Sequence, residues 1–149
     1  MTKPRDKVTL HLPEGVIGIR NATCPNGCSL MDPTTTIHNL PSIKVQYSVD
    51  DKTGILQLDP LYGRFDSVHE WDPPSGSVVE FSCTNCGVSL RSEEGTCQAC
   101  DSPMFALQLP SGIVEGCLRR GCLYHKMTIV DSDALMEDLF RQHHLDTWL

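Results

Sequence analysis

The sequence has no long apolar run. Every apolar stretch falls well short of the roughly 18 consecutive residues that a membrane-spanning helix needs. The first residues, MTKPRDKVTLHLPEG, carry charges with no continuous apolar segment behind them, which is not the pattern of a secretory signal peptide. We therefore expect no membrane segment and a cytoplasmic location.

The motifs of common enzyme classes are also missing. The sequence contains no HExxH, no GxSxG, no GxxxxGK[ST], and no H-x-E followed by PCxxC. Two clusters of acid–base residues remain, HEW at 69–71 and HH at 143–144, and we interpret both as surface or packing features. We expect a chain that is not catalytic by itself.

Basic residues are few. Twelve Lys and Arg stand against 19 Asp and Glu, which gives a formal net charge of -7. The densest basic groups, KPRDK at 3–7 and RR at 119–120, are far apart in the sequence. Nucleic-acid binding depends on a concentrated basic surface. The charge therefore argues against a nucleic-acid partner, although a nucleic-acid-binding protein stays an alternative.

Cysteine, by contrast, is abundant: the 149 residues include eight. In a reducing cytosol, closely paired cysteines are better explained by metal ligation than by disulfides. We expect two zinc ions with four thiolates each, and mononuclear iron is the alternative because four thiolates also suit that metal. The expected ligands are Cys24, Cys28, Cys83, Cys86, Cys97, Cys100, Cys117 and Cys122.

Residues 83–100, CTNCGVSLRSEEGTCQAC, place two CxxC pairs ten residues apart. The stretch resembles the short zinc-ribbon family over residues 81–105. That resemblance implies one zinc held by the two CxxC pairs, with the intervening residues folded as a small hairpin. Gly87 suits the positive φ that such a loop requires, and Asp101 tolerates it better than most residues.

The remaining four cysteines occur in GIRNATCPNGCSL and GIVEGCLRRGCLY, two segments that echo one another. The echo predicts a second site that joins Cys24 and Cys28 to Cys117 and Cys122. A competing partition joins Cys24 and Cys28 to Cys83 and Cys86 instead. His125 and His38 are lesser candidates for ligands.

Strand patterns dominate the rest of the chain. Residues 43–49 alternate apolar and polar side chains, and a turn at 50–54 leads into a second alternating segment. Further strands are expected at 77–83, at 104–117 with a turn at 110–112, and at 125–130. We expect a single zinc-braced domain over 1–149. The fold class predicted is mainly β with one C-terminal α-helix at 131–147, which offers a surface for docking to another chain.

A small acidic metal-braced β protein without a catalytic motif is typical of an accessory subunit. The pairs CPNGC, CTNC, CQAC and CLRRGC, in a chain of this length and acidity, resemble those of the small zinc-bearing subunits of acetone and acetophenone carboxylases. The resemblance implies a structural zinc subunit that assembles or braces a larger ATP-dependent ketone carboxylase. A rubredoxin-like electron carrier is the alternative if the metal is iron.

Overall fold

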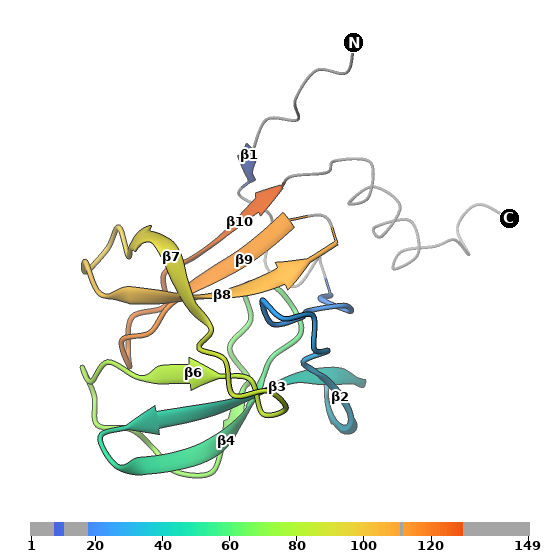
Figure 1. The fold of residues 1–149 in the computed structure, drawn as a ribbon, viewed down its shortest axis with the longest axis horizontal. Coiled ribbons are helices and arrows are strands. Elements are labelled where there is room, and N and C mark those ends of the chain that lie inside the picture. The colour runs from blue at the N-terminus through green and yellow to red at the C-terminus, as the bar shows by residue number, and fades with distance from the viewer. Residues whose placement is uncertain (1–7, 11–17, 111, 130–149) are drawn as a thin grey trace, which may run out of the picture.

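The computed structural model describes residues 8–10, 18–110 and 112–129. Over these residues the chain forms strands joined by turns and loops (Figure 1). The strands are β1 (Val8–Leu10), β2 (Met31–Ile37), β3 (Leu40–Val49), β4 (Lys52–Leu58), β5 (Val68–His69), β6 (Glu80–Ser82), β7 (Arg91–Thr96), β8 (Pro103–Leu109), β9 (Gly112–Cys117) and β10 (His125–Ile129).

The first sheet has the strand order β2-β3-β4-β5, and β6 also pairs with β3. Its centre is the antiparallel hairpin of β3 and β4, in which Ile43 lies opposite Leu58 and Val49 opposite Lys52. Alternation along β3 buries Ile43, Val45 and Tyr47 on one face, as a period of two requires. The hairpin expected from the sequence is confirmed, with a shorter turn at 50–51.

The second sheet has the order β1-β10-β9-β8-β7, with every neighbouring pair antiparallel. The strand pair expected over 104–117 is present as β8 and β9, and β10 continues the sheet after Cys122. A side chain cannot be added at Gly112, because a Cβ there would lie 1.9 Å from the carbonyl oxygen of Thr128 on β10.

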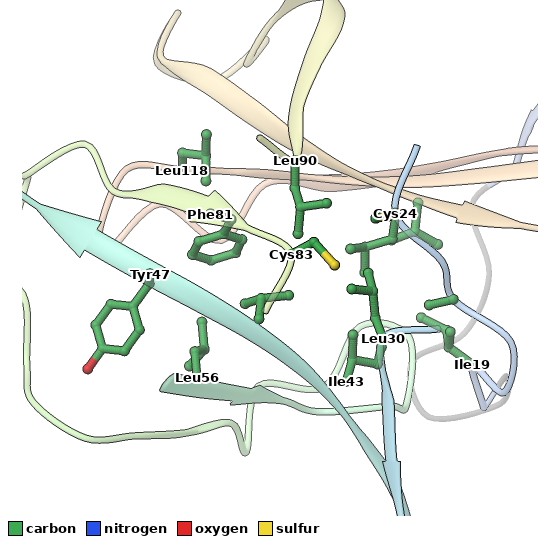
Figure 2. Close-up of a cluster of buried hydrophobic side chains, with 14 of the residues drawn as sticks. Ile19, Cys24, Leu30, Ile43, Tyr47, Leu56, Phe81, Cys83, Leu90 and Leu118 are labelled. Atoms are coloured by element: carbon green, nitrogen blue, oxygen red, sulfur yellow. The ribbon is translucent and has the colours of Figure 1, made fainter. Parts of the chain in front are cut away.

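One hydrophobic core lies between the two sheets. Figure 2 shows Leu90 and Leu118 on one side of this core and Ile43 and Leu56 on the other. Cys24 and Cys83 belong to the same core and are each about 1% exposed. Two of the predicted metal ligands are therefore held by the packing that joins the sheets.

The predicted fold class needs a correction. The described residues contain strands and no helix, so that part of the fold is β structure alone. The helix predicted over 131–147 lies outside the described residues. Its prediction depended on local periodicity and on the acidic residues at its start.

Candidate metal centres

All eight cysteines gather into two groups of four. Within each group the sulfur atoms lie within 4.8 Å of one another, so each group could hold a metal ion. We call Cys24, Cys28, Cys83 and Cys86 the first cysteine cluster, and Cys97, Cys100, Cys117 and Cys122 the second cysteine cluster.

The first cluster is formed by two tight loops that face each other. In one loop the N–H of Gly27 donates to the carbonyl of Cys24 at 2.9 Å, and in the other the N–H of Gly87 donates to the carbonyl of Cys83, also at 2.9 Å. Both glycines have positive φ, 87° and 78°, which other residues adopt only with strain. These glycines let each loop turn sharply enough to present its cysteines on one side.

Backbone N–H groups point at the sulfurs of the first cluster. Asn26 N–H donates to Cys24 Sγ at 3.3 Å, and Asn85 N–H donates to Cys83 Sγ at 3.4 Å. The Cys28 N–H also donates to Cys24 Sγ, at 3.4 Å. Such N–H···S bonds stabilise thiolate, the form that binds metal.

The second cluster repeats this loop geometry. Ala99 N–H donates to Cys97 Sγ at 3.3 Å, and Arg119 N–H donates to Cys117 Sγ at 3.4 Å. Asp101 follows Cys100 with φ of 62°, so it adopts the left-handed conformation that the sequence predicted for it. The loops lie where β7 leads into β8 and where β9 leads into β10.

The spacing of the sulfurs fits a tetrahedral metal. Zinc–thiolate bonds of about 2.3 Å at tetrahedral angles place sulfurs about 3.8 Å apart. The observed separations are 3.7 Å for Cys24 and Cys86, 3.8 Å for Cys97 and Cys122, and 3.4 Å for Cys100 and Cys117. All eight cysteines are free rather than disulfide-bonded. The donor set therefore suits Zn²⁺ or Fe.

Hydrogen bonding makes the thiols of the first cluster unequal. The backbone N–H of Val88 is the main reason that the pKa of Cys86 falls to about 6. The amide of Asn85 acts to lower the pKa of Cys28, but the neighbouring thiols and burial outweigh it and raise that pKa to about 11. One thiol therefore ionises readily while another resists, because hydrogen bonds favour the thiolate of Cys86 whereas the neighbouring thiols and burial favour the protonated form of Cys28.

The second cluster shows the same division. Ser102 donates to Cys100 through its side chain and backbone, which lowers the pKa of Cys100 to about 6. Burial raises the pKa of Cys117 well above its usual value. Four thiolates can share one site when a divalent cation offsets their mutual repulsion. Each cluster thus has the chemistry of a metal site.

The expected partition of the ligands is wrong, and the competing one is found. The sequence favoured pairing Cys83 and Cys86 with Cys97 and Cys100, but these pairs belong to different clusters. The reason is that residues 91–96 form the extended strand β7, which pairs with β8 rather than folding as a hairpin. Six strand residues span about 20 Å, which separates the two pairs.

The candidate histidines lie outside both clusters. His125 Nδ1 lies 2.8 Å from the carbonyl oxygen of Leu123, and its ring contacts Tyr62 and Phe65 edge-on. His69 contacts Asp72 on the surface, consistent with the interpretation of HEW at 69–71 as a surface feature. The pair HH at 143–144 lies outside the described residues.

His38 belongs to a third group of potential ligands, and the two aspartates of that group were not identified from the sequence. His38 Nε2 lies 3.0 Å from Asp59 Oδ2 and 3.2 Å from Asp66 Oδ2. Asp59 and Asp66 are 20 or more residues from His38, so no short motif marks them. The side-chain amides of Asn26 and Asn85, which also contact sulfurs, carry no signal beyond their place inside the cysteine loops.

The part of the chain that the structure describes includes no helix that could cross a membrane. No protein-family model, curated protein or solved structure matches this chain.

Proposed function

We propose that the protein is a non-catalytic accessory subunit whose two cysteine clusters hold structural zinc ions. The observation that supports this best is that each cluster offers four thiolates and lies in or beside the packed core. A catalytic zinc keeps a coordination position open for water or substrate, whereas four protein thiolates fill a tetrahedral site. Free thiols at these positions suit a reducing compartment, and we assign the protein to the cytoplasm.

The first cluster would brace the two sheets against each other. It joins loops from distant parts of the chain, 24–28 and 83–86, and two of its cysteines are buried in the shared core. A metal site that is absent from the unfolded chain contributes its binding free energy to folding. Zinc would thus stabilise a domain whose hairpins alone are marginal.

The charged side chains argue against a nucleic-acid partner. Among the described residues, four basic side chains lie within ion-pair distance of an acidic one. The pairs are Arg64 with Asp66, Arg91 with Glu80, Arg120 with Asp72, and Lys126 with Glu115. A protein partner fits this surface better, because the described residues also expose the large apolar side chains of Phe65, Val68, Val78 and Leu123.

Two measurements test the proposal. Elemental analysis of protein purified without added metal should find close to two zinc ions per chain and little iron. Removing the metal with a chelator should abolish the cooperative thermal transition. Metal-free protein with an unchanged melting temperature would rule out a structural role for zinc.

A second experiment tests the accessory role. The chain, purified from its native host with a cross-linker, should bring down a defined larger enzyme in fixed stoichiometry. Ketone carboxylases are the first class of enzyme to assay, because the cysteine pairs resemble those of their small zinc-bearing subunits. A Phe65→Ser, Leu123→Ser double variant should lose the partner while keeping its zinc, with Thr84→Ser as the matched surface control. A chain that stays monomeric in the native extract would refute the role.

A rubredoxin-like electron carrier is the second candidate, since Cys86 is exposed and would place a metal close to the surface. Iron in place of zinc would make the purified protein red, and dithionite would bleach it. A colourless protein excludes this candidate.

A further inference from the structure

Two segments of the chain, 18–31 and 78–91, form the same local structure. In the first, Leu30 N–H donates to the carbonyl of Ala22 at 2.9 Å, and in the second, Leu90 N–H donates to that of Phe81 at the same distance. A bridge joins Thr23 to Ser29, and another joins Ser82 to Ser89. The sequences GIRNATCPNGCSLM and VVEFSCTNCGVSLR share Cys, Asn, Gly, Ser and Leu in this order.

The hairpins that follow the two segments also correspond. Lys44 N–H donates to the carbonyl of Leu30 at 2.7 Å, and Ala106 N–H donates to that of Leu90 at 2.7 Å. Each hairpin has an irregularity at the same place. It falls between Asp32 and Thr36 in the first hairpin and between Arg91 and Thr96 in the second. The pairs Met31–Ile43 and Thr36–Pro41 of the first hairpin correspond to Arg91–Phe105 and Thr96–Pro103 of the second.

Each segment then pairs with the hairpin that follows the other segment. Ser82 pairs with Gln46 on β3, and Thr23 bridges Gln108 on β8. These contacts exchange segments between two units, one in each sheet of Figure 1. The first cysteine cluster, with two ligands from each segment, lies at the junction of the exchange.

The loops after the hairpins complete the correspondence. Ile19 N–H donates to the carbonyl of Pro60 at 2.7 Å, and Val79 N–H donates to that of Leu118 at 2.8 Å. Four residues after Pro60 and Leu118 the chain turns back. The N–H of Arg64 donates to the carbonyl of Leu61, and the N–H of Cys122 donates to the carbonyl of Arg119, both at 3.0 Å. The preceding glycines, 63 and 121, both have positive φ, 84° and 99°.

This register aligns Asp59 with Cys117 and Arg64 with Cys122. The Oδ1 atom of Asp59 accepts the N–H of Leu61 at 2.9 Å, just as Cys117 Sγ accepts the N–H two residues further along. On the hairpin side, His38 lies in the turn that corresponds to the loop from Cys97 to Cys100. The group of His38, Asp59 and Asp66 therefore occupies the place of the second cysteine cluster.

The chemistry of this group favours salt bridges over a metal. The Asp59 side chain is 1% exposed, and its Oδ2 accepts the N–H of Asp66 at 3.0 Å in addition to contacting His38. Arg64, aligned with a metal ligand of the other half, brings a cation to 3.6 Å from Asp66. A guanidinium repels a metal ion and compensates a carboxylate directly.

We propose that residues 18–67 and 78–125 are two copies of one metal-binding unit. At the position where the second copy holds its metal, the first copy has a group of ion-paired side chains, His38, Asp59, Arg64 and Asp66. The two metal ions then have different tasks. The ion of the first cluster joins the copies, and that of the second cluster braces one copy alone.

Rebuilding the lost site tests the proposal. Residues 36–41, TIHNLP, are replaced by TCQACDSP from 96–103, together with Asp59→Cys and Arg64→Cys. The variant should bind one more zinc per chain than the parent, and Co²⁺ loading should raise the thiolate-to-metal absorption accordingly. The same graft with Ser at its four new cysteine positions is the control. A folded variant with no additional ion overturns the proposal.

The native chain gives a second test that does not depend on the graft folding. His38→Ala and Asp59→Asn should leave the zinc content unchanged while lowering the melting temperature, and Mn²⁺ or Zn²⁺ titration of the parent should reveal no further site. A third ion in the parent that is lost in His38→Ala overturns the proposal, as does an unchanged melting temperature in both variants. The graft is tested by the difference in zinc content between the variant and the parent. A failure of the proposed function would instead show in the zinc content of the parent itself, so the two failures can be told apart.

Discussion

Asn26 and Asn85 reach across the first cysteine cluster in opposite directions. The side-chain amide of Asn26 donates to Cys86 Sγ at 3.5 Å, and that of Asn85 donates to Cys28 Sγ at 3.2 Å. Each asparagine thus donates to a sulfur of the facing loop. The pair fixes the relative position of the loops and adds hydrogen bonds to thiolates that a metal would share.

Replacing both asparagines should loosen the metal of the first cluster. We expect Asn26→Ala, Asn85→Ala to release one of the two zinc ions about tenfold more readily to a chromogenic chelator, because groups that hydrogen-bond to metal ligands contribute about this much affinity. Thr84→Ala, in the same loop, is the control. Equal release of both ions would contradict a role specific to the first cluster.

The partition of the ligands can be observed directly by ¹¹³Cd NMR. Protein loaded with two Cd²⁺ should give two resonances. Cys28→Ser should perturb the same resonance as Cys86→Ser, and Cys100→Ser the same one as Cys117→Ser. The sequence-based pairing of Cys86 with Cys100 predicts a different grouping, so a shared resonance for those two would contradict the structure.

Loss of the first cluster should cost more stability than loss of the second. The first cluster closes a loop of 54 residues between Cys28 and Cys83 (83 - 28 - 1), and the second one of 16 between Cys100 and Cys117 (117 - 100 - 1). Closing the longer loop removes more entropy from the unfolded chain, so the first cluster should add about 1 kcal/mol more to the free energy of unfolding than the second. Denaturation of Cys28→Ser and Cys117→Ser, both half-buried positions, measures the difference.

Tyr47→Phe should destabilise the protein without touching the metal. The buried hydroxyl of Tyr47 donates to the carbonyl of Trp71 at 2.6 Å and accepts the N–H of Trp71 at 2.8 Å. Removing it leaves both backbone groups without this partner, at a cost of about 1–3 kcal/mol in the free energy of unfolding. The zinc content should match wild type, and a loss below about 0.5 kcal/mol would contradict the contact.

Asp32 should make stability depend on acid pH. The Thr34 hydroxyl, 2.5 Å away, is the main group that lowers the pKa of Asp32 below its usual value of 3.8. Because the folded pKa is the lower one, the stabilisation is present above about pH 4 and is lost as pH falls through the folded pKa. Asp32→Asn should therefore lower the free energy of unfolding by about 1–2 kcal/mol at pH 6.

The comparison needs both proteins measured at several pH values. The gap between wild type and Asp32→Asn should narrow below pH 3.8, and any release of metal in acid affects both chains alike. A gap that stays constant down to pH 3 would show that ionisation of Asp32 contributes nothing.

The sequence by itself determined the features that depend on neighbouring residues. Alternation along 43–49 fixed which face of β3 is buried, because a strand has a period of two. The cysteine spacings, with Gly27 and Gly87 nearby, fixed tight loops that present sulfurs together. Eight cysteines in four close pairs also indicated metal before any contact was known.

Only the tertiary structure decided which loops meet. Ten residues between Cys86 and Cys97 are enough for a hairpin, but the last six of them form β7. This strand pairs with β8 and separates the two cysteine pairs. The similarity between the segments around Cys24 and Cys117 predicted a shared metal site, and that prediction is wrong for the same reason. Partner choice between cysteine loops depends on strand pairing across the whole chain, whereas spacing along the sequence reports only on the loop itself.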